Sequence, residues 1–104
     1  MKILIDGQPL IQLNLIMMSK PYTDLLVTSE YISREFDENI DPIELMWHRD
    51  DENRLVEAIE PTDWLVQFDN QLPMSIDKPI FIPRHEWHRT IKGTGKLKIK
   101  IYKS

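Results

Sequence analysis

The chain has 104 residues, a formal net charge of −4 and no cysteine. This length fits one domain with one hydrophobic core, and 41% apolar and 29% charged residues are typical of a globular protein. The lack of cysteine excludes disulfides, thiolate metal sites and cysteine nucleophiles, and it favours a reducing compartment. Because non-specific nucleic-acid binding depends on neutralising phosphates, this mildly acidic chain is not expected to bind nucleic acid.

The start of the chain predicts neither a signal peptide nor a membrane anchor. The apolar stretch between Met1 and Gly7 is too short to direct secretion, because the charged Asp6 interrupts it. The apolar run from Pro9 to Met18 contains Gln12 and Asn14, and it is well below the ~20 residues that a membrane-spanning helix needs. We therefore expect a cytoplasmic protein that does not enter the membrane.

The first quarter of the chain predicts short strands. Residues 2–5 form a β-rich run, Asp6-Gly7 is a strong hairpin turn signal, and the loose alternation over residues 10–15 favours a second strand. Pro21 ends that pattern, and residues 25–28 predict a further strand. The stretch from Ser29 to Phe36 instead predicts a helix of two turns, with Ser29 as its cap and with Asn39 and Pro42 beyond its end.

From Ile43 onwards the sequence predicts strands only. In the last of them, Leu97, Ile99 and Ile101 alternate with lysines and are expected to face inward. Short strands with turn signals spaced at ~8–12 residues are typical of a sandwich or barrel. The predicted strands span residues 43–48, 54–59, 64–68, 71–76 (an edge strand), 79–82, 88–91 and 97–101.

Charge is unevenly distributed, with an acidic middle and a basic end. Two interpretations stay open: the two segments pair in one sheet or across a dimer, or the basic end forms a patch for an anionic partner. The acidic residues are Asp37, Glu38, Asp41, Glu44, Asp50, Asp51, Glu52, Glu57, Glu60 and Asp63, and the basic ones are Arg84, Arg89, Lys92, Lys96, Lys98, Lys100 and Lys103.

Two histidine-containing segments suggest a metal site. On a strand, alternate residues share a face, so His48 and Asp50 are expected to point into the barrel together. In the second segment His88 shares a face with Glu86, whereas His85 lies on the other face. His48, Asp50 and His88 then form a set of two imidazoles and one carboxylate, which suits Fe(II) and also Mn, Ni or Zn. The imidazoles are neutral and the carboxylate ionised near pH 7, as metal binding requires.

The same residues have simpler interpretations. His48 at a barrel mouth can be satisfied by Asp50 or Glu52 without any metal. Glu57 and Glu86 are weaker candidates for ligand binding, as a carboxylate pair inside the barrel.

The residues flanking the candidate ligands raise a separate expectation. His85 is expected on the surface. Trp47 and Trp87 flank candidate ligands on the opposite face, where they either pack on the N-terminal strands or form the contact of a homodimer.

Residues 43–101 resemble the cupin superfamily, whose two sequence motifs are separated by a strand, a turn and a strand. The second cupin motif is matched at Pro83 and His88, while Asp77, His85 and Lys92 replace its two glycines and its asparagine.

In the first motif His48 matches the leading histidine and Asp50 replaces the second one. The glutamate of that motif falls at Arg54 or Leu55, neither of which is an acid.

The resemblance implies an all-β, cupin-like double-stranded β-helix barrel (jelly roll), here over residues 1–104 as a single domain and with one short helix. Cupins often form homodimers and often hold one metal in the mouth of the barrel, so the resemblance implies both features here. Asp50 would act as the third ligand, as in the similar His-x-Asp…His pattern of Fe(II)/2-oxoglutarate oxygenases. Lys98 or Lys100 is the candidate for holding their co-substrate, although the strand alternation points both lysines outward.

Two functions therefore remain open. One is a small cupin with a mononuclear divalent metal site open to a small polar ligand or oxygen, with an Fe-dependent, oxygenase-like reaction as its candidate chemistry. The other is a non-catalytic β-barrel without metal that binds a small ligand or serves as a structural or interaction domain.

Overall fold

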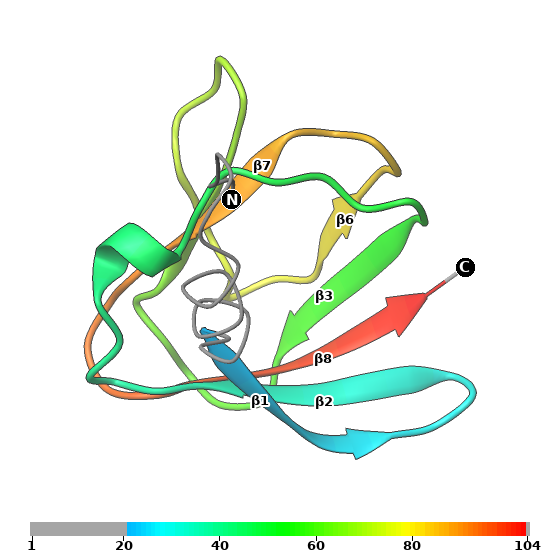
Figure 1. The fold of residues 1–104 in the computed structure, drawn as a ribbon, viewed down its shortest axis with the longest axis horizontal. Coiled ribbons are helices and arrows are strands. Elements are labelled where there is room, and N and C mark those ends of the chain that lie inside the picture. Colours follow the sequence, from blue (N-terminus) through cyan, green and yellow to red (C-terminus); the bar gives the residue numbers. More distant parts are fainter. Residues whose placement is uncertain (1–20, 104) are drawn as a thin grey trace, which may run out of the picture.

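The structure is a computed structural model that describes residues 21–103 (Figure 1). The predicted strands over residues 2–5 and 10–15, and the turn at Asp6-Gly7, lie outside the described residues. Within residues 21–103, no helix has the length and apolar character needed to cross a membrane.

Two antiparallel sheets make up the described part of the chain. The larger sheet has the strand order β1-β2-β8-β3-β6, and the smaller has the order β5-β4-β7. Figure 1 shows β1, β2, β8 and β3 side by side in the lower part of the view, with β7 across the molecule from them in the upper part. The strands are β1 (Tyr22–Val27), β2 (Tyr31–Phe36), β3 (Arg54–Ala58), β4 (Leu65–Phe68), β5 (Met74–Ser75), β6 (Ile80–Ile82), β7 (His88–Ile91) and β8 (Leu97–Lys103).

The hydrophobic core lies between the inner faces of the two sheets. As the alternation predicted, Leu97, Ile99 and Ile101 of β8 are buried. Trp64, just before β4, is fully buried, and its indole nitrogen donates a hydrogen bond to the carbonyl of Gly95 at 3.0 Å. The partner that this buried donor needs is thus supplied by the turn before β8.

The helix predicted over residues 29–36 is wrong, because residues 31–36 form strand β2. Ile32, Arg34 and Phe36 are buried in alternation with partly exposed neighbours, which is the period of a strand. β2 pairs with β1 on one side and with β8 on the other, so two ladders of hydrogen bonds outweigh a helical preference that extends over only two turns. Within the described residues, helical structure is limited to one 3₁₀ turn, Pro42–Glu44.

The strand predicted over residues 43–48 is also largely wrong. Pro42 occupies the first position of the 3₁₀ turn, whose cap Asp41 accepts a hydrogen bond from the Ile43 amide at 3.1 Å. After this turn only His48 pairs in the manner of a strand, through one bridge to His88. The remaining predicted strands within residues 21–103 each overlap an observed one.

The acidic middle and the basic end of the chain meet within the large sheet. Glu57 on β3 lies directly opposite Lys100 on β8, and the Lys98 ammonium is 3.6 Å from the Glu60 carboxylate. Exposed pairs of this kind contribute little to stability. They bring two acids of the middle close to two lysines of the end, and an anionic partner for the other basic residues stays a prediction.

Candidate metal centre

The bridge between His48 and His88 holds two imidazoles side by side. Each residue donates its backbone N–H to the carbonyl of the other at 2.9 Å. Directly opposed residues of an antiparallel pair project their side chains from the same face, and here the ring centroids are 4.3 Å apart. His88, at the start of β7, is buried, whereas His48 is exposed at the rim.

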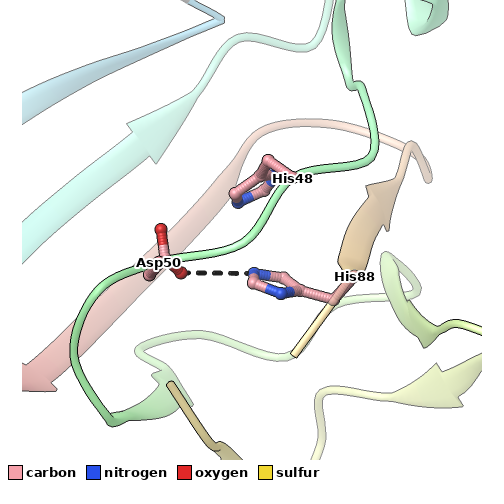
Figure 2. Close-up of side chains that lie close together, drawn as sticks. All are labelled: His48, Asp50 and His88. Carbon is pink, nitrogen blue, oxygen red and sulfur yellow. Dashed lines mark ion pairs between the residues drawn. The ribbon is translucent and has the colours of Figure 1, made fainter. Parts of the chain in front are cut away.

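Asp50 completes the group from the same segment as His48. Its Oδ2 lies 3.4 Å from Nε2 of His88. One potential ligand atom from each of His48, Asp50 and His88 falls within 4.8 Å of the others, and Figure 2 shows the three side chains converging. The structure therefore brings together the three residues that the sequence singled out.

Backbone carbonyls fix which nitrogen of each ring is free. Nδ1 of His48 lies 3.0 Å from the carbonyl oxygen of Met46, and Nδ1 of His88 lies 2.8 Å from that of Glu86. A carbonyl oxygen can only accept, so both Nδ1 atoms donate, and in the neutral rings Nε2 keeps its lone pair. A second hydrogen bond that orients a metal-binding imidazole in this way is usual in metal sites.

The surroundings of His88 favour its neutral form. Burial lowers the pKa of His88 below its usual 6.5, and the nearby His48 and Arg54 act in the same direction. The hydrogen bond to the Glu86 carbonyl and the charge of Asp50 oppose this lowering without reversing it. Near pH 7 the ring is therefore unprotonated and able to bind a metal ion.

The carboxylate of Asp50 has one satisfied and one unsatisfied oxygen. Oδ1 is 3.5 Å from Nη1 of Arg54, whereas Oδ2 is buried and accepts no hydrogen bond from residues 21–103. Leaving such an acceptor unpaired costs about 1–3 kcal/mol, and more when the group is charged. A cation placed between this oxygen and the two Nε2 atoms would satisfy it, so the residues present fit a metal ion.

The three side chains lie at the wall of a cavity of about 310 Å³. Most of its wall is apolar and comes from both sheets, including Val56 and Ile82 of the large sheet and Val66 of the small one. Two arginines, Arg34 and Arg54, also line it. A cavity of this size and composition suits a small ligand with a short apolar body.

The weaker candidates for ligand binding do not line this cavity. Glu57 shares a face of β3 with Leu55, opposite to the inward-facing Val56, and its carboxylate lies 3.5 Å from the Tyr102 hydroxyl. Glu86 contributes only its backbone carbonyl to the histidine network. The two glutamates therefore do not form a carboxylate pair inside the barrel.

Three other residues named from the sequence lie on the surface. His85 is exposed, as predicted, 3.6 Å from the carboxylate of Asp51. Trp47 and Trp87 are 39% and 45% exposed, on the outward face of the segment that carries the histidines. A dimer contact at these tryptophans stays a prediction.

Sequence reasoning missed the two arginines of the cavity. A helix over residues 29–36 does not point Arg34 inward, whereas the place of Arg34 between Ile32 and Phe36 in an alternating stretch is the signal that does. In the sequence, Arg54 is one of the two positions at which the glutamate of the cupin motif falls. Its role becomes visible with its Nη1 beside Asp50 and its Nε 3.3 Å from Oε2 of Glu52.

Comparison with solved structures shows the fold. An RmlC-like cupin with a double-stranded β-helix fold from Methanocaldococcus jannaschii aligns with a TM-score of 0.58 at 11% identity, over 83% of this chain and 82% of that one. KdgF from Halomonas sp. aligns with a TM-score of 0.56 at 13% identity, over 79% and 77%. FeII HppE aligns with a TM-score of 0.54 at 17% identity, over 80% and 48%.

At the level of sequence, no protein-family model matches this chain, and no curated protein matches it significantly. The structural similarities nevertheless agree with the sequence resemblance to cupins. The described part of the chain has the double-stranded β-helix fold of that superfamily.

Proposed function

We propose that this chain, which has the cupin fold, binds one divalent transition-metal ion through Nε2 of His48, Nε2 of His88 and Oδ2 of Asp50. The observation that carries the proposal is the buried, unpartnered Oδ2 of Asp50 beside two imidazoles whose Nδ1 atoms are already engaged. All three donors are thus oriented and unused. Such an arrangement is costly without a cation and favourable with one.

The donor set favours Fe(II) within the group Fe, Mn, Ni and Zn. Two imidazoles and one carboxylate on one side of an ion are typical of non-haem Fe(II) oxygenases. FeII HppE is one of the structures that share this fold. We propose an Fe-dependent, oxygenase-like reaction on a small polar ligand held in the cavity.

In such a reaction the ion would supply coordination positions for the ligand and oxygen. The residues of the chain would hold and shield them. His88 stays neutral because it is buried, and Arg54 orients Asp50 through Oδ1 so that Oδ2 faces the two rings. The apolar walls limit the access of water to the cavity.

The test is the metal content of the protein purified without an affinity tag. We expect about one equivalent of metal per chain, and the double substitution His48→Ala/His88→Ala should remove it. The matched control is His85→Asn. His85 is the remaining one of the three histidines, and asparagine tolerates its positive φ of 67°. Equal metal content in the double variant and the control would contradict the proposal.

The alternative function, a small-ligand-binding or structural barrel without metal, has one observation in its favour. Arg54, one of the two positions at which the acidic ligand of the cupin motif falls, lies with its Nη1 3.5 Å from Oδ1 of Asp50. In that case the wild-type protein contains no metal, and a chelator leaves its melting temperature unchanged.

A further inference from the structure

A row of large apolar side chains crosses the outer face of the large sheet. Tyr31 of β2 lies directly opposite Tyr102 of β8. Tyr102 in turn lies opposite Leu55 of β3, and Leu55 lies opposite Phe81 of β6. Each of these residues is next to a buried residue of its own strand, so its side chain points outward. We call these four residues the outer row.

The outer row is a contiguous exposed patch. Phe81 is 55% exposed and Leu55 39%, and the two tyrosines are partly exposed. With neighbouring strands ~4.8 Å apart, a row across four strands is about 14 Å wide. Single exposed apolar residues are normal on a protein surface, whereas a contiguous patch marks an interaction site. The outer face of the large sheet is therefore a candidate for contact with another molecule.

The row beside the outer row carries two charges whose groups do not meet within the chain. Lys100 of β8 lies opposite Glu57 of β3, two residues along each strand from Tyr102 and Leu55. Among residues 21–103, however, neither side chain forms an ion pair. The Lys100 ammonium lies over the Tyr31 ring, 4.9 Å from its centroid. Glu57 accepts one long hydrogen bond, 3.5 Å, from the Tyr102 hydroxyl.

The outer row is complementary to itself. The four strands that carry it lie in the order β2-β8-β3-β6. A two-fold axis that runs along the strands, midway between β8 and β3, exchanges β8 with β3 and β2 with β6. Tyr102 then packs on Leu55 of a second copy, and Tyr31 packs on Phe81 of that copy. Two sheets packed face to face in this way keep their strands roughly aligned.

The charges obey the same symmetry. Under this axis Lys100 of each copy faces Glu57 of the other, so two ion pairs form across the contact. A stable dimer buries about 800 Å² per copy, which extends beyond the outer row, so the charged row lies inside the interface. Charges buried there need opposite partners, and the symmetry supplies them. The acidic middle and the basic end of the chain thereby meet across a dimer as well as within one sheet.

We propose that this chain forms a homodimer through the outer face of the large sheet, about the two-fold axis between β8 and β3. The face fits a second copy because the same residues supply both halves of every contact. Val56 and Ile101, which line the cavity, project from the opposite face of β3 and β8. The metal centre therefore lies outside the interface, and the inference does not rest on the proposed function.

The first test is the mass of the full-length protein in solution, measured by sedimentation velocity. The wild type should be a dimer at about 10 µM. Leu55→Thr/Phe81→Thr removes two apolar anchors and keeps the β propensity of both positions, and it should raise the dissociation constant of the dimer about 100-fold or more. The matched control is Trp47→Thr/Trp87→Thr, which removes two similarly exposed side chains elsewhere and should stay dimeric.

The second test reverses the two charges one at a time, at low salt. Lys100→Glu alone brings two acids together at each symmetric contact, and Glu57→Lys alone brings two lysines together. Each variant should dimerise at least about tenfold more weakly than the wild type. When the two variants are mixed, they should form a heterodimer, because each acid of one then faces a lysine of the other. Native mass spectrometry, with one variant labelled with ¹⁵N, identifies this heterodimer.

Each result supports or overturns the inference, provided that a cooperative urea transition shows each variant to be folded. A wild type that is monomeric at about 100 µM would overturn it and leave the outer row to residues 1–20 of the same chain or to another protein. A dimer that is lost in the tryptophan control and kept in Leu55→Thr/Phe81→Thr would move the contact to the tryptophans. A mixture that is no more dimeric than either charge variant alone would contradict the two-fold arrangement, because a contact within one chain cannot give this rescue.

Discussion

The two short segments that carry the histidines have an outer and an inner face, formed by alternate residues, and the two faces differ in whether their polar groups have partners. On the outer face, the Arg89 guanidinium lies 4.9 Å from the ring centre of Trp47, and that of Arg49 lies 5.1 Å from the ring centre of Trp87. Each cation thus has an aromatic partner across the bridge.

The inner face, one residue away along each segment, is incomplete. His48 and His88 hold their Nε2 atoms free, and Oδ2 of Asp50 is buried without a partner among residues 21–103. Alternate residues point to opposite faces. A face whose cations have aromatic partners therefore lies directly behind a face whose buried carboxylate oxygen has none among the described residues. The difference shows where a ligand is needed, since only the inner face leaves a buried charged group unsatisfied.

The largest effect on the inner face is expected when the charge of Asp50 is removed. Asp50→Asn keeps the shape of the side chain but removes the anionic donor, and it should weaken metal binding by about 100-fold or more. The control is Asp51→Asn, whose carboxylate is fully exposed. Competition with a chromophoric chelator measures both affinities, and equal losses in the two variants would contradict the assignment.

A second test uses the pH dependence of the metal-free protein. Burial lowers the pKa of His88 below the usual 6.5. As the pH falls below that value, the unfolded chain takes up a proton that the folded protein does not. The free energy of unfolding should therefore fall, by at most about 1.4 kcal/mol per pH unit, until the pH reaches the folded pKa. Well above 6.5 the residue is neutral in both states and contributes no slope.

Urea unfolding at a series of pH values measures this slope. His88→Gln should reduce it, because the titrating group is gone. His85→Asn should leave it unchanged, since the His85 side chain is 57% exposed. An unaltered slope in His88→Gln would show that burial of this ring does not govern the acid response.

The outer face should give the smallest effect. Trp47→Ala removes one cation–π contact on an exposed ring and should lower the free energy of unfolding by about 0.5–1 kcal/mol for that contact. Metal affinity should stay within about twofold of the wild type, because the side chain points away from the donors. Chemical denaturation together with metal titration checks both, and a large loss of metal affinity would mean that the two faces are coupled.

Much of the site could be predicted from the sequence, because alternation decides which neighbours share a face. His48 with Asp50 follows from that rule, whereas His85 lies away from His88 because it is in a turn, with a positive φ of 67°. The pairing of His48 with His88 could not be derived, since residues 43–48 form a 3₁₀ turn and one bridge where a strand was predicted. The resemblance to the cupin motifs supplied the long-range contact that local pattern lacks.

The error at residues 29–36 has a different cause and a larger consequence. A helix and a strand can share a short apolar spacing, and only the pairing of β2 with β1 and β8 separates them. As part of strand β2, Arg34 faces the buried side of the large sheet, a position that a helix over residues 29–36 does not predict. Over short segments, tertiary pairing decides the structure, and the position of a functional side chain changes with it.

The most direct test of the central claim is a crystal of the protein loaded with Co²⁺, with data collected at the cobalt absorption edge. The account predicts one anomalous peak about 2.0–2.2 Å from Nε2 of His48, Nε2 of His88 and a carboxylate oxygen of Asp50. A crystal with no peak there, or with its strongest peak at His85 and Asp51 on the surface, would contradict it.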